Sequence, residues 1–172
     1  ANGRAGLQLV DVSDPAAPSL AGVYDTPGIA RDVVIAPDGN TAFVVASTGR
    51  LQIIDVTDPA NPSLLAAVTS GLSLTRAVDI SSNGNVLYIT DQIDGLVIFD
   101  VSDPSNPQNL GVLEVDGLPE DISVSPDGTK IYLANSTGGL KIINVENPAS
   151  PSLLATFDTG GSAYGVNVSN ND

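Results

Sequence analysis

Four copies of one segment recur along this chain of 172 residues, and they constrain its fold more than any other feature. The copies begin 44, 45 and 44 residues apart. They read LQLVDVSDPAAPSL from Leu7, LQIIDVTDPANPSL from Leu51, LVIFDVSDPSNPQNL from Leu96 and LKIINVENPASPSL from Leu140. A repeat of this length is one supersecondary unit that cannot bury its apolar faces alone, so similar units are predicted to stack side by side.

Each unit contains four short β-rich runs and no helical periodicity. In residues 30–71, Pro37-Asp38-Gly39-Asn40 joins two runs and favours a tight turn, because Pro fixes φ and Gly accepts a positive φ. A third strand is expected at 51–56 and a fourth at 63–69. Several runs are apolar on both faces, as in sheets buried on both sides. The sequence predicts an all-β fold, a β-propeller of four-stranded antiparallel blades, ahead of a β-solenoid, whose repeats are usually shorter.

The repeated core segment also resembles the LVIVD repeats of secreted and surface proteins of bacteria and archaea, which are related in pattern to YVTN-type propeller repeats. The motif stands here as LQLVD, LQIID, LVIFD and LKIIN, and it covers essentially the whole chain. The fourth copy departs from the others, with Asn144 and Asn147 in place of Asp. The resemblance implies a propeller blade and an extracellular or cell-surface location. It implies no catalytic motif.

Alignment of the copies divides the chain into blades. Complete blades are expected at 30–71, 75–117 and 119–161, the outer strands of a partial blade at 1–28, and the inner strand of another at 163–172. Three interpretations follow: the chain is part of a longer propeller of roughly seven or eight blades, several chains form one ring, or four blades close alone. Open blades expose unpaired strand edges, so self-association is expected under the assembling interpretations.

Charge and composition exclude several classes of partner and chemistry. The net charge is −14, with 20 acidic and 6 basic residues, so nucleic-acid binding is not expected. The chain has no apolar run of the ~18 residues needed to insert across a membrane. It contains no Cys and no His, which removes thiol nucleophiles, imidazole bases and the usual zinc ligands.

Acidic residues in the turns on one face of the predicted propeller are weak candidates for Ca²⁺ ligands. They are Asp14, Asp38, Asp58, Asp103, Asp127 and Glu146. Ca²⁺ takes six to eight oxygen ligands, and a ring of carboxylates offers oxygens. Asp in such turns also accepts hydrogen bonds from nearby backbone N–H groups, which explains these residues without a metal. No metal and no other cofactor is therefore expected, with Ca²⁺ as the alternative.

The last polar residue of the repeated motif is expected to have a structural role. It is Asp11, Asp55, Asp100 or Asn144, at a strand end among apolar neighbours. A buried carboxylate there needs hydrogen-bond donors, and the amides of the adjacent turn provide them. Because the residue recurs in every unit, holding the blade together is a better explanation than catalysis, which needs one site.

The opposite face, at the mouth of the channel, is the expected ligand site because its residues differ between units. The candidates are Arg31, Asp32, Arg76, Glu120, Asp121 and Tyr164. Arg binds carboxylates and sulfates through paired donors. Alternatively, the arginines pair with Asp32, Glu120 or Asp121. Glu120 and Asp121 are adjacent on a strand and point to opposite sides, so they do not flank one glycosidic bond.

These observations predict a non-enzymatic extracellular or cell-surface module that acts in protein or glycan recognition, adhesion or assembly. A hydrolase or lactonase that uses carboxylates and a divalent metal is the alternative from another class. A purely structural repeat spacer is the third. All three share one fold, so the fold alone does not separate them.

Overall fold

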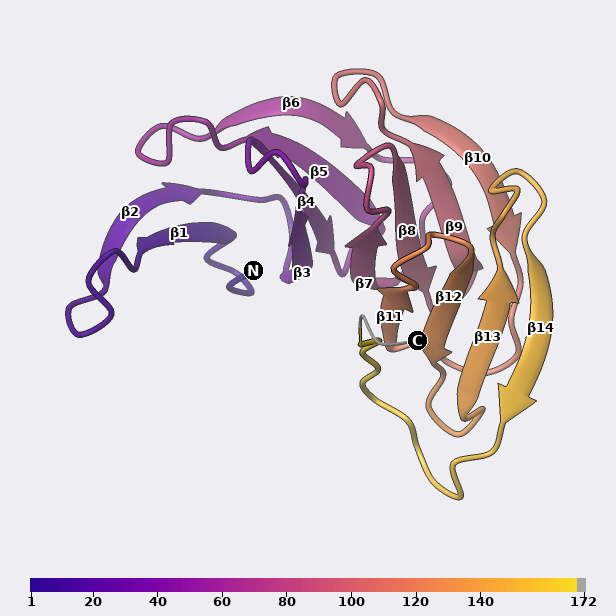
Figure 1. Ribbon diagram of the computed structural model, residues 1–172. Coiled ribbons are helices and arrows are strands. Elements are labelled where there is room, and N and C mark those ends of the chain that lie inside the picture. Colours follow the sequence, from indigo (N-terminus) through magenta and orange to yellow (C-terminus); the bar gives the residue numbers. More distant parts are fainter. Residues whose placement is uncertain (170–172) are drawn as a thin grey trace.

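The computed structural model describes residues 1–169 and shows four antiparallel sheets side by side along an open arc (Figure 1). The first sheet holds only β1 (Leu7–Asp11) and β2 (Ser19–Tyr24). The second holds β3 (Ala30–Ile35), β4 (Thr41–Ala46), β5 (Arg50–Asp55) and β6 (Ser63–Val68). The third holds β7 (Thr75–Ile80), β8 (Val86–Asp91), β9 (Gly95–Asp100) and β10 (Gln108–Leu113). The fourth holds β11 (Asp121–Val124), β12 (Lys130–Ala134), β13 (Leu140–Asn144) and β14 (Ser152–Phe157).

This arrangement confirms the all-β propeller class. Each complete sheet is a meander of four strands in chain order, and the three sheets lie at 30–68, 75–113 and 121–157, inside the bounds expected for the blades. No helix forms in residues 1–169, and so none there is available to cross a membrane. The ends of the arc do not meet in Figure 1, so the interpretation in which four blades close alone is wrong for this structure.

The turns between the first and second strands of the complete blades form as the sequence predicts. Gly39, Gly84 and Gly128 have φ values of 77°, 77° and 70°. The amide of each glycine donates to the carbonyl oxygen three residues earlier at 2.8 Å. Only glycine adopts this φ without a steric cost, which is why each turn carries one at this point.

A β-bulge interrupts the pairing of the two outermost strands in all four sheets, which in the first sheet are its only two strands. In the first sheet the bulge lies next to Gly22, where a Cβ atom would stand 2.0 Å from the carbonyl oxygen of Pro59. Pro59 belongs to the turn between β5 and β6, so the outer turn of one blade packs on the bulge of the preceding blade. The bulge of the first sheet thus gives the second blade a place to pack, and Gly111 in the third sheet meets Pro148 of the fourth in the same way.

The hydrophobic core consists of side chains packed between the faces of neighbouring sheets. Phe43 and Ile53 of the second sheet pack against the third sheet, whereas Val44 and Ile54 pack against the first. All four side chains are at most 1% exposed. Full burial of such a side chain contributes about 1.5–3 kcal/mol, so the double-sided apolar pattern is what holds neighbouring blades together.

The outer face of the first sheet lacks such a neighbour. Val10 and Val12 are 52% and 63% exposed, whereas Ile143 and Val145, at the same repeat positions, are 0% and 1% exposed. Phe157, at the other end of the arc, is 65% exposed. The apolar surfaces that are buried where two blades meet are therefore exposed on the end blades of the arc.

The inner strand expected at 163–172 is only partly formed. Ala163 makes an antiparallel bridge with Ser136, but residues 164–169 belong to no strand, and 170–172 lie outside the described residues. The physical reason is that no described strand lies beside this segment to form a ladder. Side chains of β11 bind its amides instead.

Candidate functional site

Carboxylates on the inner strands bind the next blade along the arc. In each case an aspartate Oδ2 accepts a hydrogen bond from a backbone N–H of the following inner segment. The bonds join Asp32 to Val78 at 2.9 Å, Asp79 to Val124 at 2.8 Å and Asp121 to Val166 at 2.9 Å. The donors lie on the strand edges that face the channel, so these side chains satisfy backbone groups that no strand pairs.

Two of these carboxylates also bind their own strand. Asp32 Oδ1 accepts from the amide of Val33, and Asp79 Oδ1 accepts from the amide of Ile80, both at 2.8 Å. Burial raises the pKa of Asp79, the charges of Asp32 and Asp121 raise it further, and the two amide donors partly offset this rise. Asp32 and Asp121, which are predicted ligand-binding residues, each bind a backbone amide of the next blade in this structure.

Arg76 belongs to a polar network at the mouth of the channel. Its Nη2 donates to Gln92 Oε1 at 2.9 Å, and Gln92 Nε2 donates to Glu120 Oε1 at 2.8 Å. The Nε atom of Arg76 lies 3.7 Å from Glu120 Oε2. The pairing of Arg76 with Glu120 was one of the two outcomes considered from the sequence. Gln92, which lies in the loop between β8 and β9, was not among the predicted site residues.

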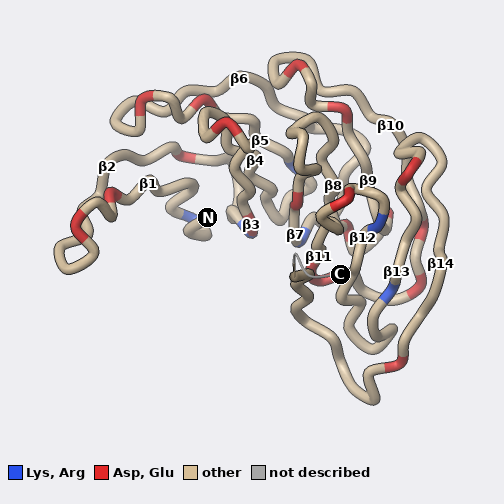
Figure 2. The backbone as a smooth tube through the Cα atoms, in the orientation of Figure 1, with Lys and Arg blue, Asp and Glu red and all other residues tan. Residues whose placement is uncertain are grey.

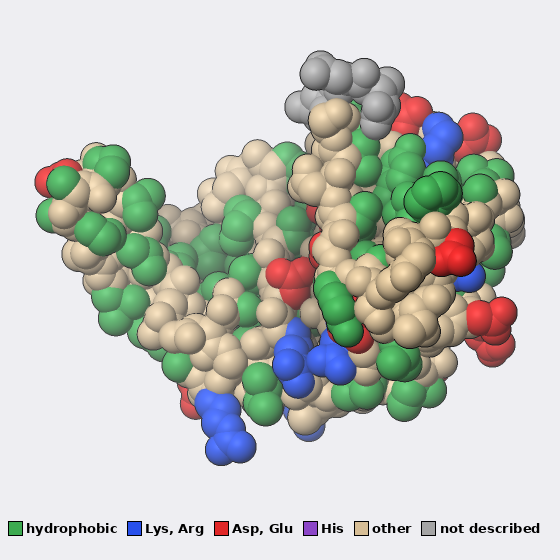
Figure 3. Space-filling model, turned by 90° about the horizontal axis from the view of Figure 1, so that it is seen from below, with side chains coloured by type: hydrophobic (Ala, Val, Ile, Leu, Met, Phe, Trp, Pro, Cys, Tyr) green, Lys and Arg blue, Asp and Glu red, His purple; other side chains and the backbone are tan. Residues whose placement is uncertain are grey.

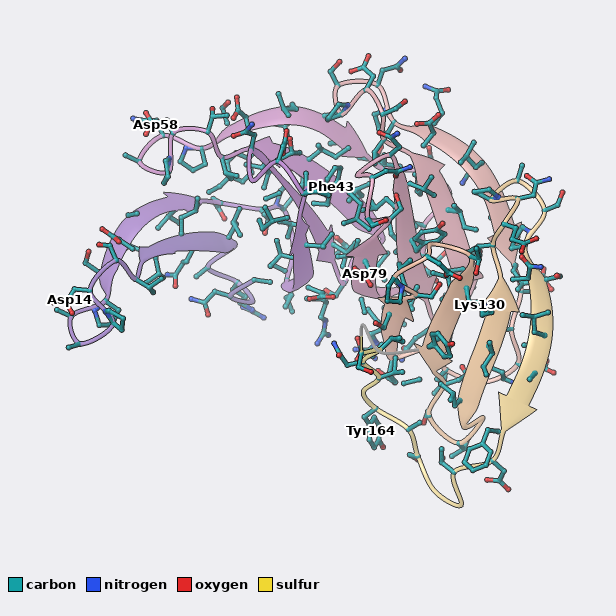
Figure 4. The ribbon with its side chains drawn as sticks, viewed as in Figure 1. Asp14, Phe43, Asp58, Asp79, Lys130 and Tyr164 are labelled. Atoms are coloured by element: carbon teal, nitrogen blue, oxygen red, sulfur yellow. The ribbon has the colours of Figure 1, made fainter. Side chains whose placement is uncertain are left out.

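Arg31 differs from Arg76 because it makes no ion pair within 4.0 Å among residues 1–169. It is exposed on β3, the strand that packs against β7. Figure 3 views the arc from below and shows basic side chains gathered beside carboxylates on this face. Tyr164 is 69% exposed and points away from the sheets at the lower end of the arc (Figure 4). We call the surface formed by Arg31, Arg76, Gln92 and Glu120 the arginine rim.

The candidate Ca²⁺ ligands occupy ordinary turn positions. Oδ1 of Asp14, Asp58 and Asp103 accepts the amide two residues later at 3.0 Å, as do Asp38 and Asp127 at 2.9 and 3.0 Å. Glu146 is exposed. Acidic residues are spread along the whole arc (Figure 2), with Asp14 and Asp58 at the tips of turns (Figure 4). Within residues 1–169, no group of three or more acidic side chains is arranged to hold a metal ion.

Hydrogen bonds lower the pKa of several turn carboxylates. The Ser125 hydroxyl, followed by the Thr129 amide and hydroxyl, holds the pKa of Asp127 well below its usual range. The Asn61 side-chain amide lowers the pKa of Asp58 in the same way. Such carboxylates stay ionised because nearby donors favour the charged form.

The motif residues predicted to be structural close local turns. Each accepts a hydrogen bond from the amide two residues later: Asp11 at 2.8 Å, Asp55 and Asp100 at 2.9 Å, and Asn144 at 2.8 Å. These bonds fix the end of each third strand to the turn that follows. The side chains are exposed or half-exposed, so the burial expected from their apolar neighbours is wrong. The apolar residues beside each of these polar residues point into the interfaces between blades, whereas the polar residue itself points toward the turn that follows the strand.

Asp91 is a buried polar residue that the sequence analysis did not predict to have a structural role. It is fully buried at the end of β8. Its Oδ2 accepts the amides of Ser73 and Leu74 at 2.7 Å, and its Oδ1 accepts those of Ile93 and Asp94 at 2.9 and 3.2 Å. The same repeat position carries Asn135, also fully buried, whose Nδ2 donates to the Asp116 carbonyl oxygen. The sequence signal was partial, because the position carries Asn2 in the first copy but Ala46 in the second.

Comparison with solved structures supports the propeller fold. A protein of unknown function from Desulfotomaculum acetoxidans superposes with a TM-score of 0.81 at 19% identity, over 99% of this chain and 55% of that chain. A Lactobacillus plantarum protein gives 0.80 at 19% identity, over 92% and 50%. The periplasmic gluconolactonase of Pseudomonas aeruginosa gives 0.73 at 18% identity, over 83% and 44%. The chain thus spans about half the length of these proteins. At such identities the likeness shows the fold alone.

A search among curated proteins finds no match. The LVIVD repeat family matches at residues 1–26, 27–70, 76–113 and 116–159, which together cover most of the chain. These matches follow the four structural units, each of which contains one copy of the motif. The chain therefore belongs to the LVIVD repeat family and forms an arc of β-propeller blades.

Proposed function

We propose that this chain is part of a non-enzymatic extracellular or cell-surface propeller that recognises an anionic group of a protein or glycan partner at the arginine rim. The observation that carries the proposal is the contrast between its two arginines. Arg76 is held by Gln92 and Glu120, whereas the exposed Arg31 has no carboxylate within 4.0 Å in the described structure. A free guanidinium is suited to bind a carboxylate or sulfate with two parallel hydrogen bonds.

The fixed network supports this role because it keeps the rim in one shape. Arg76, Gln92 and Glu120 come from two neighbouring blades, and their bonds to one another leave few alternative rotamers. A ligand that reaches Arg31 then meets an ordered surface, which reduces the entropy lost on binding. The net charge of −14 repels anions in general, so only a specific contact is expected to retain one.

The test uses a sulfated heparin hexasaccharide and its desulfated counterpart as probes, measured by calorimetry at physiological salt. We expect Arg31→Ala to weaken binding of the sulfated probe by roughly tenfold or more, since one charge-assisted contact is lost. Arg31→Lys should recover only part of the affinity, because Lys lacks the planar fork. Equal binding by Arg31→Ala, or equal binding of both probes by the native chain, contradicts the proposed site.

A lactonase is the second candidate, and it is favoured only by likeness to proteins such as the Pseudomonas gluconolactonase. Against it, both oxygens of Asp32 and Asp79 already accept backbone amides, which favours a role in joining blades over one in activating water or binding a metal. Gluconolactone hydrolysis above the spontaneous rate, dependent on added divalent metal, would support this alternative. Antibody labelling of intact cells tests the surface location separately.

A further inference from the structure

A cavity of about 310 Å³ lies between the third and fourth sheets, and none of the arginine rim residues lines it. Glu114, Val115 and Asp116, which follow β10, line it together with Ile93 from the loop between β8 and β9. Lys141 of β13 and Leu153 of β14 line it from the fourth sheet. One wall therefore carries two carboxylates and the other an ammonium group. The volume far exceeds the ~10–15 Å³ that a single water needs.

Lys141 is unusual for its place in the repeat. The equivalent residues are Gln8, Gln52 and Val97. Gln52 and Val97 are 2% and 0% exposed and lie in the interfaces between blades, whereas Gln8 is exposed at the open end of the arc. Lys141 lies on β13 and is only 9% exposed. Within residues 1–169 no carboxylate lies within 4.0 Å of its ammonium group. A largely buried cation without a close counter-charge is costly, so an anion in the cavity would stabilise it.

The two carboxylates on the opposite wall restrict what that anion can be. Glu114 and Asp116 repel a simple anion, but they attract a ligand that also carries a positive charge. The side chains of Ile93, Val115 and Leu153 offer apolar contact to the rest of such a ligand. We propose that this cavity binds a small zwitterion, such as a free amino acid, with its carboxylate at Lys141 and its ammonium group at Glu114 and Asp116.

The test compares three probes of the same shape: L-leucine, 4-methylpentanoate, which lacks the ammonium group, and 3-methylbutylamine, which lacks the carboxylate. Amide NMR shifts and calorimetry report binding. We expect L-leucine to bind with a Kd on the order of 1 mM, as a ligand of this size allows, and to shift the amides of Val115 and Asp116. Each half-probe should bind at least about tenfold more weakly, since one charged contact is missing.

Two variants separate this site from the rest of the surface. Lys141→Met should fold, because it removes an uncompensated charge, and should weaken L-leucine binding by roughly tenfold or more. If it fails to fold, Lys141→Gln, which has the residue found at Gln52, takes its place. Lys130→Met is the matched control, since Lys130 lies 3.7 Å from Asp127 at a distant turn. No L-leucine binding, equal binding of either half-probe, or unchanged binding by the Lys141 variant would overturn the proposal.

Discussion

Replacement of Asp91 by Ala should destabilise the chain more than any surface change. Asp91 is fully buried, and its two oxygens accept four backbone amides on both sides of the loop. Each bond to a charged acceptor contributes about 1.5–3 kcal/mol, but the four share one side chain and do not add. Loss of one member of a buried charged network costs about 3–5 kcal/mol. For a chain of this length, that corresponds to a fall in Tm of roughly 6–20 °C.

Urea and thermal unfolding, followed by circular dichroism, measure this effect. Asp91→Asn should lose about half as much, because it keeps one acceptor oxygen and turns an NH₂ group toward the remaining donors. Asp94→Ala is the control in the same loop, since the buried Asp94 Oδ2 has no hydrogen-bond partner among residues 1–169. Its effect should be neutral or stabilising, because a buried carboxylate oxygen without a donor costs free energy. A loss below about 1 kcal/mol in Asp91→Ala would refute the reasoning that these amides depend on the carboxylate.

Three further predictions follow from the packing and charges. Gly95→Ala should cost about 3 kcal/mol or more in unfolding free energy, because φ is 88° and a Cβ would lie 2.3 Å from a carbonyl oxygen, whereas Gly161→Ala, with open space, should be neutral. Burial raises the pKa of Asp79, so its contribution to stability is present below pH 3.8 and is lost as pH rises through the raised pKa. In urea unfolding, the free energy of unfolding of Asp79→Asn should therefore fall furthest below that of the wild type near pH 3.8 and least at pH 7. Light scattering should show self-association that Val10→Asp reduces and Val112→Asp, on an inner blade, does not.

The sequence predicted the fold well because each unit carries its own turn residues and its own two-sided apolar strands. The hairpin at Gly39 depends only on neighbours in the chain, so local chemistry determined it. The pairing of Arg76 with Glu120 was considered in advance because both residues were assigned to one face. The sequence did not show which of the two arginines is paired.

The roles of Asp32 and Asp121 could not be predicted in the same way. Each binds an amide on the next blade, and the donor is a backbone group that every residue type except proline supplies. No residue pattern marks such a donor. Lys141 was missed for a related reason. It stands in the motif where Gln and Val also occur, and its proposed role in ligand binding depends on the residues of the opposite wall of the cavity.

The aspartate bonds between blades have a consequence for how the chain folds. They join residues 46, 45 and 45 positions apart, which is one repeat and never more. The cost of closing such a loop is the same at every junction, and the longest-range step in assembly does not grow with the number of blades. Folding can therefore begin at any pair of neighbouring repeats and spread in both directions, with a rate that depends on one junction and not on the number of blades in the arc.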